Sequence, residues 1–122
     1  MKPLHVLVID DEQVICDACR LVLSENGHQV AHCITGNQGL LEIERNAYDL
    51  ILLDMKLPDI DGTRILAFIR ERALSSAVVV MTGYSTLSNA VEAMKLGAAD
   101  YLSKPFSEDE LLATIEGVFA DR

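Results

Sequence analysis

The sequence predicts an α/β protein, a single doubly wound (βα)5 domain built around a five-stranded parallel sheet. Three observations support this prediction: short apolar runs alternate with longer segments of helical periodicity, the runs are apolar on both faces, and the connections are short. Continuous apolar runs are typical of parallel strands that helices cover on both sides. Strand–helix alternation with short connections favours right-handed βαβ units, and therefore a doubly wound sheet.

Most of the predicted strands end at or close to a polar residue. The strands are predicted over residues 5–9, 29–33, 50–53, 77–81 and 99–102. The first ends at Asp10 and Asp11, the third at Asp54, the fourth at Thr82 and the fifth near Lys104. In a doubly wound sheet, ligands bind outside the carboxyl ends of the strands, so these side chains are the candidate functional residues.

Signals for helix starts occur in the segments between the strands. Thr35-x-x-Gln38 and Ser107-x-x-Glu110 have the pattern of capping boxes, which satisfy free backbone amides at a helix start. Asp61 is suited to cap a further helix in the same way.

The helices are expected to pack on the sheet through apolar stripes. The first helix is expected to end at Asn26-Gly27, and its stripe comprises Val14, Ile15, Ala18, Leu21 and Val22. The fourth helix is expected to end at Gly97, and its stripe comprises Leu87, Ala90, Val91 and Met94.

The composition is that of one folded, acidic domain. The 122 residues are 50% hydrophobic and carry a net charge of −9, which fits one domain with a substantial core. Phosphate neutralisation needs clustered Lys and Arg, so we expect no direct binding of nucleic acid. The sequence shows no signal peptide and no membrane span. An odd number of cysteines, 3, favours the reducing cytoplasm.

The residues at the strand ends have the chemistry of phosphoryl transfer. Three carboxylates at one sheet edge repel one another unless a cation intervenes, and Mg²⁺ prefers carboxylate oxygens and water. An ammonium group binds phosphate as a point charge, and a hydroxyl supplies a hydrogen bond. A carboxylate can itself be the nucleophile and become an aspartyl phosphate. The set therefore predicts a phosphoryl-transfer site with a divalent cation, formed by Asp10, Asp11, Asp54, Thr82 and Lys104.

With these residues in place, the sequence resembles the receiver domain of two-component response regulators over its whole length. The resemblance is carried by residues 6–12 (VLVIDDE), 52–62 (LLDMKLPDIDG) and 98–106 (AADYLSKPF). It implies the flavodoxin-like strand order 2-1-3-4-5 and one receiver domain over residues 1–122. The segments 81–85 and 90–97 are most similar to receivers of sigma-54-dependent transcriptional regulators, so a role in transcription regulation is expected.

The resemblance also implies the phosphoacceptor and the metal ligands. Asp54 would accept a phosphoryl group from the phosphohistidine of a sensor histidine kinase or a phosphotransfer protein. Asp11 and Asp54 would bind Mg²⁺ directly, Asp10 would bind it chiefly through water, and the backbone carbonyl of Lys56 would complete the protein ligands. Mn²⁺ is a second candidate for the same site.

A conformational switch is implied as well. Thr82 and Lys104 would contact the phosphoryl group, and the Lys104-Pro105 peptide resembles one that is cis in this family. Tyr101 lies at the family's aromatic switch position and would turn inward as Thr82 moves toward the phosphate. A half-buried strand aromatic with no such role explains Tyr101 equally well. The remodelled surface would be that of the fourth helix, the fifth strand and the fifth helix, which is the expected output or homodimer face.

Two further residues are expected to set the lifetime of the phosphorylated state. Lys56 lies two residues after the acceptor, and Tyr84 lies two residues after Thr82. These positions flank the approach of water in the family, so a long Lys and a bulky Tyr should slow self-dephosphorylation.

An enzyme is the main alternative to this switch, which would catalyse only its own phosphorylation and slow dephosphorylation. The segment 59–63, Asp-Ile-Asp-Gly-Thr, matches the nucleophile motif of haloacid-dehalogenase-type phosphatases. That motif must directly follow a buried strand, whereas here the strand ends at Asp54 and Pro58 intervenes. A stand-alone receiver and a fragment of a longer regulator are both compatible with the sequence.

Two other motifs favour no separate chemistry. Cys16-x-x-Cys19 lies inside a predicted helix rather than at a helix N-terminus, where the thiolate of a redox pair is stabilised, so the cysteines are expected to be apolar filler. Gly36-x-x-Gly39 is not a dinucleotide-binding fingerprint.

Overall fold

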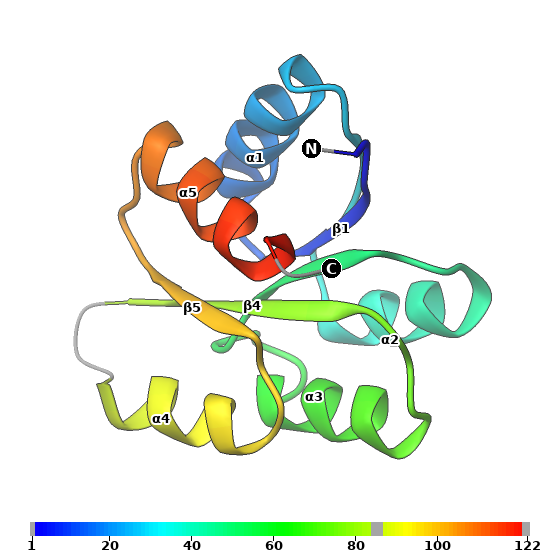
Figure 1. Cartoon of the computed structure of the whole chain (residues 1–122). Helices are drawn as coiled ribbons and strands as arrows, with labels where there is room; N and C mark the ends of the chain where they lie inside the picture. Colours follow the sequence, from blue (N-terminus) through cyan, green and yellow to red (C-terminus); the bar gives the residue numbers. More distant parts are fainter. Residues whose placement is uncertain (1, 84–86, 121–122) are drawn as a thin grey trace.

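The computed structural model describes residues 2–83 and 87–120, which form a parallel sheet with helices on both faces (Figure 1). The strand order is β2-β1-β3-β4-β5, as the sequence predicts. The strands are β1 (His5–Ile9), β2 (Gln29–Cys33), β3 (Leu50–Asp54), β4 (Ala77–Thr82) and β5 (Asp100–Ser103). β3 and β4 each include the polar residue expected to follow them, and β5 starts one residue later than predicted.

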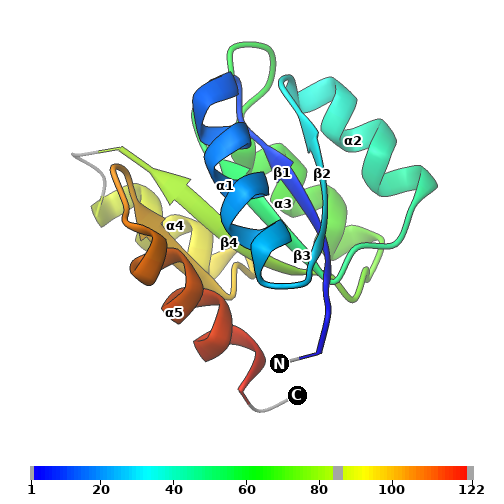
Figure 2. The same cartoon turned by 90° about the horizontal axis from the view of Figure 1, so that it is seen from above.

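Helices connect consecutive strands and form two layers. They are α1 (Gln13–Glu25), α2 (Gly36–Arg45), α3 (Gly62–Glu71), α4 (Leu87–Lys95) and α5 (Glu108–Phe119). Figures 1 and 2 show α1 and α5 on one face of the sheet and α2, α3 and α4 on the other. This arrangement leaves the carboxyl ends of the strands free to form a site at one edge.

Alternate residues of the central strands fill two separate cores. Val6 and Val8 face α1 and α5, whereas Leu7 and Ile9 face the layer of α2, α3 and α4. Residues 50–54 of β3 are all buried, which explains why this strand is a continuous apolar run rather than an alternating one.

The predicted N-cap residues are confirmed, and of the two predicted capping boxes the one at α5 is complete, whereas at α2 the structure gives the Thr35 half. Thr35 Oγ1 accepts a hydrogen bond from the Gln38 amide at 3.1 Å, and Asp61 Oδ1 accepts one from the Thr63 amide at 3.0 Å. Ser107 and Glu110 form a complete, reciprocal capping box at the start of α5. Gly27 and Gly97, with φ of 87° and 105°, end α1 and α4 in the left-handed conformation that glycine adopts most readily.

The apolar stripe predicted for α1 is confirmed in part, because Ile15 and Val22 are partly buried against the core, but it is wrong at other positions. Val14 and Leu21 are 68% and 62% exposed, while the buried residues are Cys16, Cys19 and Leu23. The helix turns its small cysteine side chains toward the sheet, since these allow closer packing than the branched residues of the predicted stripe.

The stripe predicted for α4 is confirmed at Ala90 and wrong at Val91 and Met94. Ala90 and Ala93 are buried, whereas Val91 and Met94 are 47% and 41% exposed. The side chain of Leu87 lies outside the described residues. Small residues again form the packed face, which leaves larger apolar side chains on the surface of α4.

The helices within residues 2–83 and 87–120 do not have the length and apolar character that a membrane span requires.

Candidate phosphoryl-transfer site

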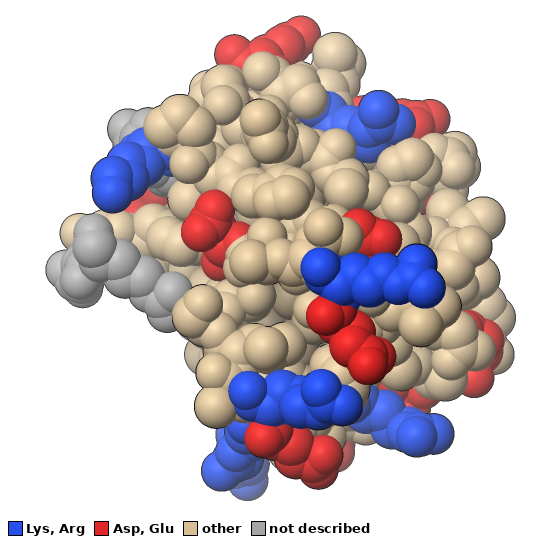
Figure 3. All heavy atoms as spheres, turned by 90° about the vertical axis from the view of Figure 1, so that its right-hand side faces the viewer, with Lys and Arg blue, Asp and Glu red and all other residues tan. Residues whose placement is uncertain are grey.

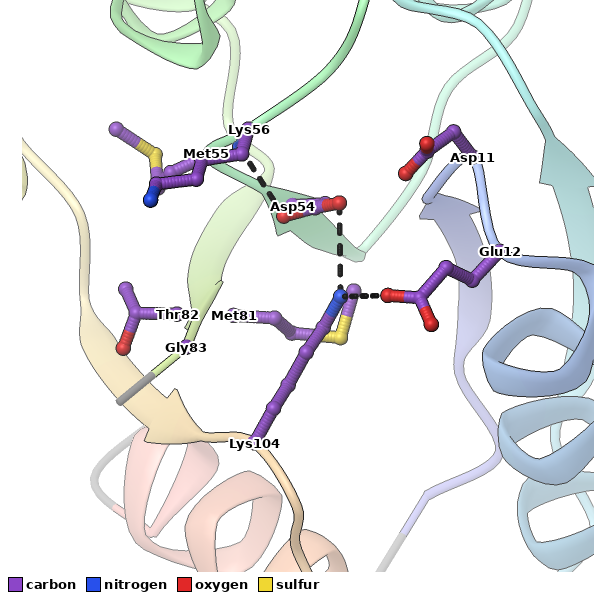
Figure 4. A pocket seen from close by; sticks show the side chains of 9 residues that line it. All are labelled: Asp11, Glu12, Asp54, Met55, Lys56, Met81, Thr82, Gly83 and Lys104. Atoms are coloured by element: carbon purple, nitrogen blue, oxygen red, sulfur yellow. Dashed lines mark hydrogen bonds and ion pairs between the residues drawn. The ribbon is translucent and has the colours of Figure 1, made fainter. Parts of the chain in front are cut away.

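A cavity of about 280 Å³ lies at the carboxyl edge of the sheet (Figure 4). Asp11 and Glu12 line it from the end of β1, Asp54 from β3, Thr82 from β4 and Lys104 from the loop after β5. Met55, Lys56, Met81 and Gly83 complete the lining. Four strand ends therefore bring together the residues that the sequence pattern singled out.

Backbone hydrogen bonds between neighbouring strand ends hold this arrangement. The Asp10 amide donates to the Cys33 carbonyl at 3.1 Å, and the Lys104 amide donates to the Thr82 carbonyl at 2.6 Å. The peptide between Lys104 and Pro105 is cis, as expected from the resemblance. Asp10, Asp54 and Thr82 are 0%, 5% and 6% exposed, so three polar residues lie inside the protein at this edge.

Lys104 is the cation that partly balances the carboxylates. Its Nζ lies 2.7 Å from Asp10 Oδ2, 3.4 Å from Glu12 Oε1 and 3.5 Å from Asp54 Oδ2. Burial disfavours the charge on Lys104, but the contact with Asp10 and the charges of Asp54 and Glu12 outweigh it and raise the pKa of the ammonium group. Lys104 is therefore charged, paired most closely with Asp10 and also close to Asp54.

Asp54 is the carboxylate that the site perturbs most. Burial, helped by the negative charge of Asp10, raises its pKa from 3.8 to about 6, against the opposing effects of Lys104 and of the hydrogen bond that the Lys56 amide donates to Asp54 Oδ1 at 3.1 Å. A single ammonium group does not neutralise this cluster. A further cation would relieve the remaining repulsion.

The acidic residues at the end of β1 fit such a cation. Asp10, Asp11 and Glu12 each offer a carboxylate oxygen, and these oxygens lie within 4.8 Å of one another. Asp10 Oδ2 is buried and, apart from its ion pair with Lys104, has no hydrogen-bond partner among the described residues. A cluster of carboxylate oxygens of this kind is suited to a hard divalent cation such as Mg²⁺.

The other predicted residues lie around this cavity. Lys56 is exposed, and its amide rather than its ammonium group contacts Asp54. Tyr101 is 42% exposed on β5 and does not line the cavity. Figure 4 shows the Thr82 hydroxyl oxygen on the side away from Asp54. Tyr84 lies outside the described residues.

Sequence reasoning about strand ends missed Glu12. Its side chain reaches Lys104 and lines the cavity, although it belongs to the loop before α1 rather than to a strand. Its position directly after Asp10 and Asp11 was the available signal, because three consecutive acidic residues at a strand end concentrate negative charge.

The residues of the phosphatase motif do not form a nucleophile site. Asp59 is exposed, and its two carboxylate oxygens accept hydrogen bonds from the Gly36 and Asn37 amides at the start of α2. Asp61 caps α3 through the Thr63 amide. Both carboxylates serve as caps away from the strand end, so the haloacid-dehalogenase alternative is not supported.

The cysteines are packed as predicted for apolar filler. Cys16 and Cys19 lie within α1 and are fully buried, and Cys33 is 8% exposed. Burial, with neighbouring negative charges, raises the thiol pKa values of Cys16 and Cys19 to about 11 and about 12. These thiols are therefore protonated at neutral pH and poorly suited to redox chemistry.

A larger hollow, of about 460 Å³, lies at the opposite end of the sheet between α3 and α4. Figure 3 shows that end of the molecule, where acidic and basic side chains are interspersed among uncharged residues. The described residues that line this hollow include Arg70 and Lys95 but no carboxylate. Among the described residues, the acidic cluster that could hold a metal ion is the one at the carboxyl edge.

The structure is a doubly wound α/β fold with an acidic cavity at the carboxyl edge of its sheet. The chain belongs to the response regulator receiver domain family, which residues 6–116 match. The transcriptional regulatory protein DltR of Streptococcus agalactiae is 38% identical over 112 residues, which are 92% of this chain and 50% of DltR. The transcriptional regulatory protein ZraR of Escherichia coli is 37% identical over 117 residues, 96% of this chain and 26% of ZraR.

Solved structures agree with this family. A response regulator receiver domain protein from Clostridium thermocellum superposes with a TM-score of 0.86 at 35% identity, covering 95% of this chain and 94% of that one. NtrX from Brucella abortus gives a TM-score of 0.92 at 30% identity, covering 98% of this chain and 27% of NtrX. The chain thus spans only part of DltR, ZraR and NtrX, and the predicted fold and family are confirmed.

Proposed function

We propose that residues 1–122 form one receiver domain that is phosphorylated on Asp54 by a sensor histidine kinase or a phosphotransfer protein. The observation that carries this proposal is the position of the Asp54 carboxylate, buried at the end of β3 and 3.5 Å from Lys104 Nζ in an open cavity. A nucleophile that is buried yet reachable, with a fixed cation beside it, is suited to phosphoryl transfer, because that chemistry depends mainly on positioning and charge neutralisation.

In the proposed reaction, an Asp54 carboxylate oxygen forms a bond to phosphorus. The bond between phosphorus and the donor imidazole breaks, and its electron pair remains on the imidazole nitrogen. The Lys104 ammonium group pairs with the phosphoryl oxygens, and Thr82 donates a hydrogen bond to one of them. The domain catalyses this transfer on itself and does not turn over a substrate.

The divalent cation site is formed by Asp10, Asp11, Asp54 and the backbone carbonyl of Lys56. Mg²⁺ bound there supplies positive charge that offsets the repulsion between the incoming phosphoryl group and the carboxylates. The cluster of carboxylate oxygens from Asp10, Asp11 and Glu12 supports this assignment.

Phosphorylation shifts a two-state equilibrium at the surface of α4, β5 and α5. Thr82 moves toward the phosphoryl group, and Tyr101 turns inward from its exposed position on β5. The surface that changes carries the exposed apolar residues Val91 and Met94, so it suits binding of an output domain, a partner protein or a second copy. Since relatives such as DltR and ZraR are transcriptional regulators, we propose that the output is transcription regulation.

Intact-mass analysis tests the acceptor and the metal together. The protein is incubated with acetyl phosphate and Mg²⁺, alongside Asp54→Ala and a sample with the metal chelated. We expect wild type to gain one phosphoryl group and both controls to gain none. An adduct that persists in Asp54→Ala would refute the acceptor assignment.

The lifetime of the phosphorylated state is a separate prediction. Lys56 is exposed beside the cavity, where a long side chain obstructs the approach of water to the phosphoryl group. We expect Lys56→Ala to lose its phosphoryl group faster than wild type after the donor is removed, as followed by intact mass over time. An unchanged lifetime would contradict shielding by Lys56. The Tyr84→Ala variant gives the parallel test for Tyr84.

A further inference from the structure

The loop that follows the acceptor is fastened at its tip to the first turn of α2. Asp59 Oδ1 accepts a hydrogen bond from the Gly36 amide at 2.9 Å, and Asp59 Oδ2 accepts one from the Asn37 amide at 2.9 Å. Asp59 is 23 positions from Gly36 and 22 positions from Asn37 in the sequence. We call this set of contacts between Asp59 and the amides of residues 36 and 37 the α2 latch.

Packing reinforces the latch. A Cβ atom at Gly36 would lie 2.4 Å from Ile60 Cγ1 and 3.2 Å from Leu57 Cδ1. Real Cβ atoms essentially never approach another atom as closely as this one would approach Ile60, so a side chain at residue 36 would force the loop or Ile60 to shift, and glycine lets the loop lie this close to the helix. The Asp59 carboxylate and the apolar side chains of Leu57 and Ile60 thus lie against the same first turn of α2.

The other end of this loop contacts the acceptor. The Lys56 amide donates to Asp54 Oδ1 at 3.1 Å, and Lys56 pairs with Asp61 in an isolated β-bridge. The Gly62 amide donates to the Met55 carbonyl at 3.4 Å, which closes the loop on itself. Because the loop is short and closed, a displacement of its tip is transmitted to Lys56 and to the hydrogen bond that orients Asp54.

Capping of α2 does not by itself explain Asp59. The helix already has an N-cap, since Thr35 Oγ1 accepts from the Gln38 amide. Asp59 instead accepts hydrogen bonds from the amides of the two residues before Gln38. It belongs to a loop that is distant in sequence and that also contains Lys56, whose amide donates to Asp54. The helix start therefore serves as a fixed support for the loop.

We propose that Asp59 is a positioning residue of the phosphoryl-transfer site: the α2 latch holds Lys56 where its amide orients Asp54 and its carbonyl serves the metal. This inference rests on the proposed function. It assigns to Asp59 a role other than that of nucleophile, and it makes the first turn of α2 part of the support of the site.

Metal affinity measured with Mn²⁺ as the probe tests the latch. Free Mn²⁺ is counted by electron paramagnetic resonance in titrations of wild type, Asp59→Ala, Asp59→Asn, Thr35→Ala and Asp54→Ala. Residues that orient metal ligands from outside typically change affinity by about tenfold or more, so we expect a weakening of about that size in Asp59→Ala. Asp59→Asn keeps one acceptor oxygen and should lie between wild type and Asp59→Ala.

Thr35→Ala is the matched control, because it removes a cap hydrogen bond from the same helix start and leaves the latch intact. We expect its Mn²⁺ affinity to stay within about twofold of wild type, the range of ordinary surface substitutions. Hydrogen exchange of the Lys56 amide should accelerate in Asp59→Ala and not in Thr35→Ala. At saturating metal, the rate of phosphorylation by acetyl phosphate should likewise fall in Asp59→Ala and not in Thr35→Ala.

The outcomes separate the latch from the proposed function. Binding of Mn²⁺ that needs Asp54 but is unchanged in Asp59→Ala would refute the latch alone. Equal losses in Asp59→Ala and Thr35→Ala would also refute it, because they would reflect general loosening of α2. Wild type that binds no Mn²⁺ would overturn the metal site itself. As a second arm, Gly36→Ala should weaken binding as Asp59→Ala does, and Gly36→Ala/Ile60→Ala should recover part of the loss.

Discussion

Replacement of Asp54 by asparagine should stabilise the protein at pH 8 in the absence of divalent cations. Burial and the nearby charge of Asp10 raise the pKa of Asp54 from 3.8 to about 6, so the folded state opposes its ionisation. A shift of about two units corresponds to about 3 kcal/mol, because each unit is worth 1.36 kcal/mol. Asparagine removes the charge but is not identical to a protonated carboxyl group, so we expect a gain of about 1–3 kcal/mol.

The difference in stability between wild type and Asp54→Asn should depend on pH, in a direction that follows from the raised pKa of Asp54. Between pH 3.8 and about 6 the folded protein holds a proton on Asp54 that the unfolded chain has released. The stability of wild type relative to Asp54→Asn therefore falls as the pH rises through this window. The difference in unfolding free energy between wild type and Asp54→Asn should be near zero below pH 3.8 and should reach its full value above about pH 6.

Urea unfolding followed by far-ultraviolet circular dichroism measures this difference, since the chain has no tryptophan. Glu44→Gln is the matched control, because it removes the same charge from an exposed position of α2. A gain in Asp54→Asn that equals the gain in Glu44→Gln, or that does not vary between pH 4 and pH 8, would refute the reasoning. Mg²⁺ should reverse the order by stabilising wild type alone.

Three further perturbations test other parts of the account. Lys104→Met leaves the buried carboxylate of Asp10 without its cation, so without Mg²⁺ it should destabilise the fold by about 3 kcal/mol in urea unfolding, and an unchanged midpoint would contradict the ion pair's role. Gly62→Ala places a Cβ atom 2.9 Å from the Met55 backbone and should cost about 1–3 kcal/mol, whereas Gly117→Ala, with open space around it in α5, should stabilise by up to about 1 kcal/mol. The three buried cysteines should not react with a thiol reagent until the protein is unfolded in urea, and fast reaction in native conditions would contradict their burial.

The sheet and the site residues could be predicted from the sequence because both follow from short-range patterns. Continuous apolar runs marked the strands, and their polar ends marked Asp54, Thr82 and Lys104. In a parallel sheet every strand end of this kind lies at the same edge, so the cavity followed from the strand positions alone.

The faces of α1 and α4 could not be predicted in the same way. Apolar periodicity placed Ala90 correctly on the buried face of α4, but it missed Cys16 and Cys19 in α1 and Ala93 in α4, which pack beside the sheet in place of larger apolar residues. Which face is buried depends on the distance between helix and sheet, and that distance is set by the packing of the whole layer.

Contacts between segments that are distant in the sequence could not be predicted either. Nothing in the local sequence shows that Asp59 meets the amides of Gly36 and Asn37, since the pairing arises only when α2 and the loop after β3 lie side by side. The Asp-x-Asp-Gly-Thr pattern instead suggested a nucleophile. The structure replaces that interpretation with two helix-capping carboxylates.

The most direct test of the central claim is to locate the phosphoryl group chemically. After treatment with acetyl phosphate and Mg²⁺, borohydride converts an acyl phosphate on aspartate into homoserine, and peptide mass spectrometry then reads its position. The account predicts homoserine at position 54 and at no other aspartate, with none formed in Asp54→Asn. Homoserine at position 59 or 61, or no conversion in phosphorylated wild type, would contradict Asp54 as the acceptor.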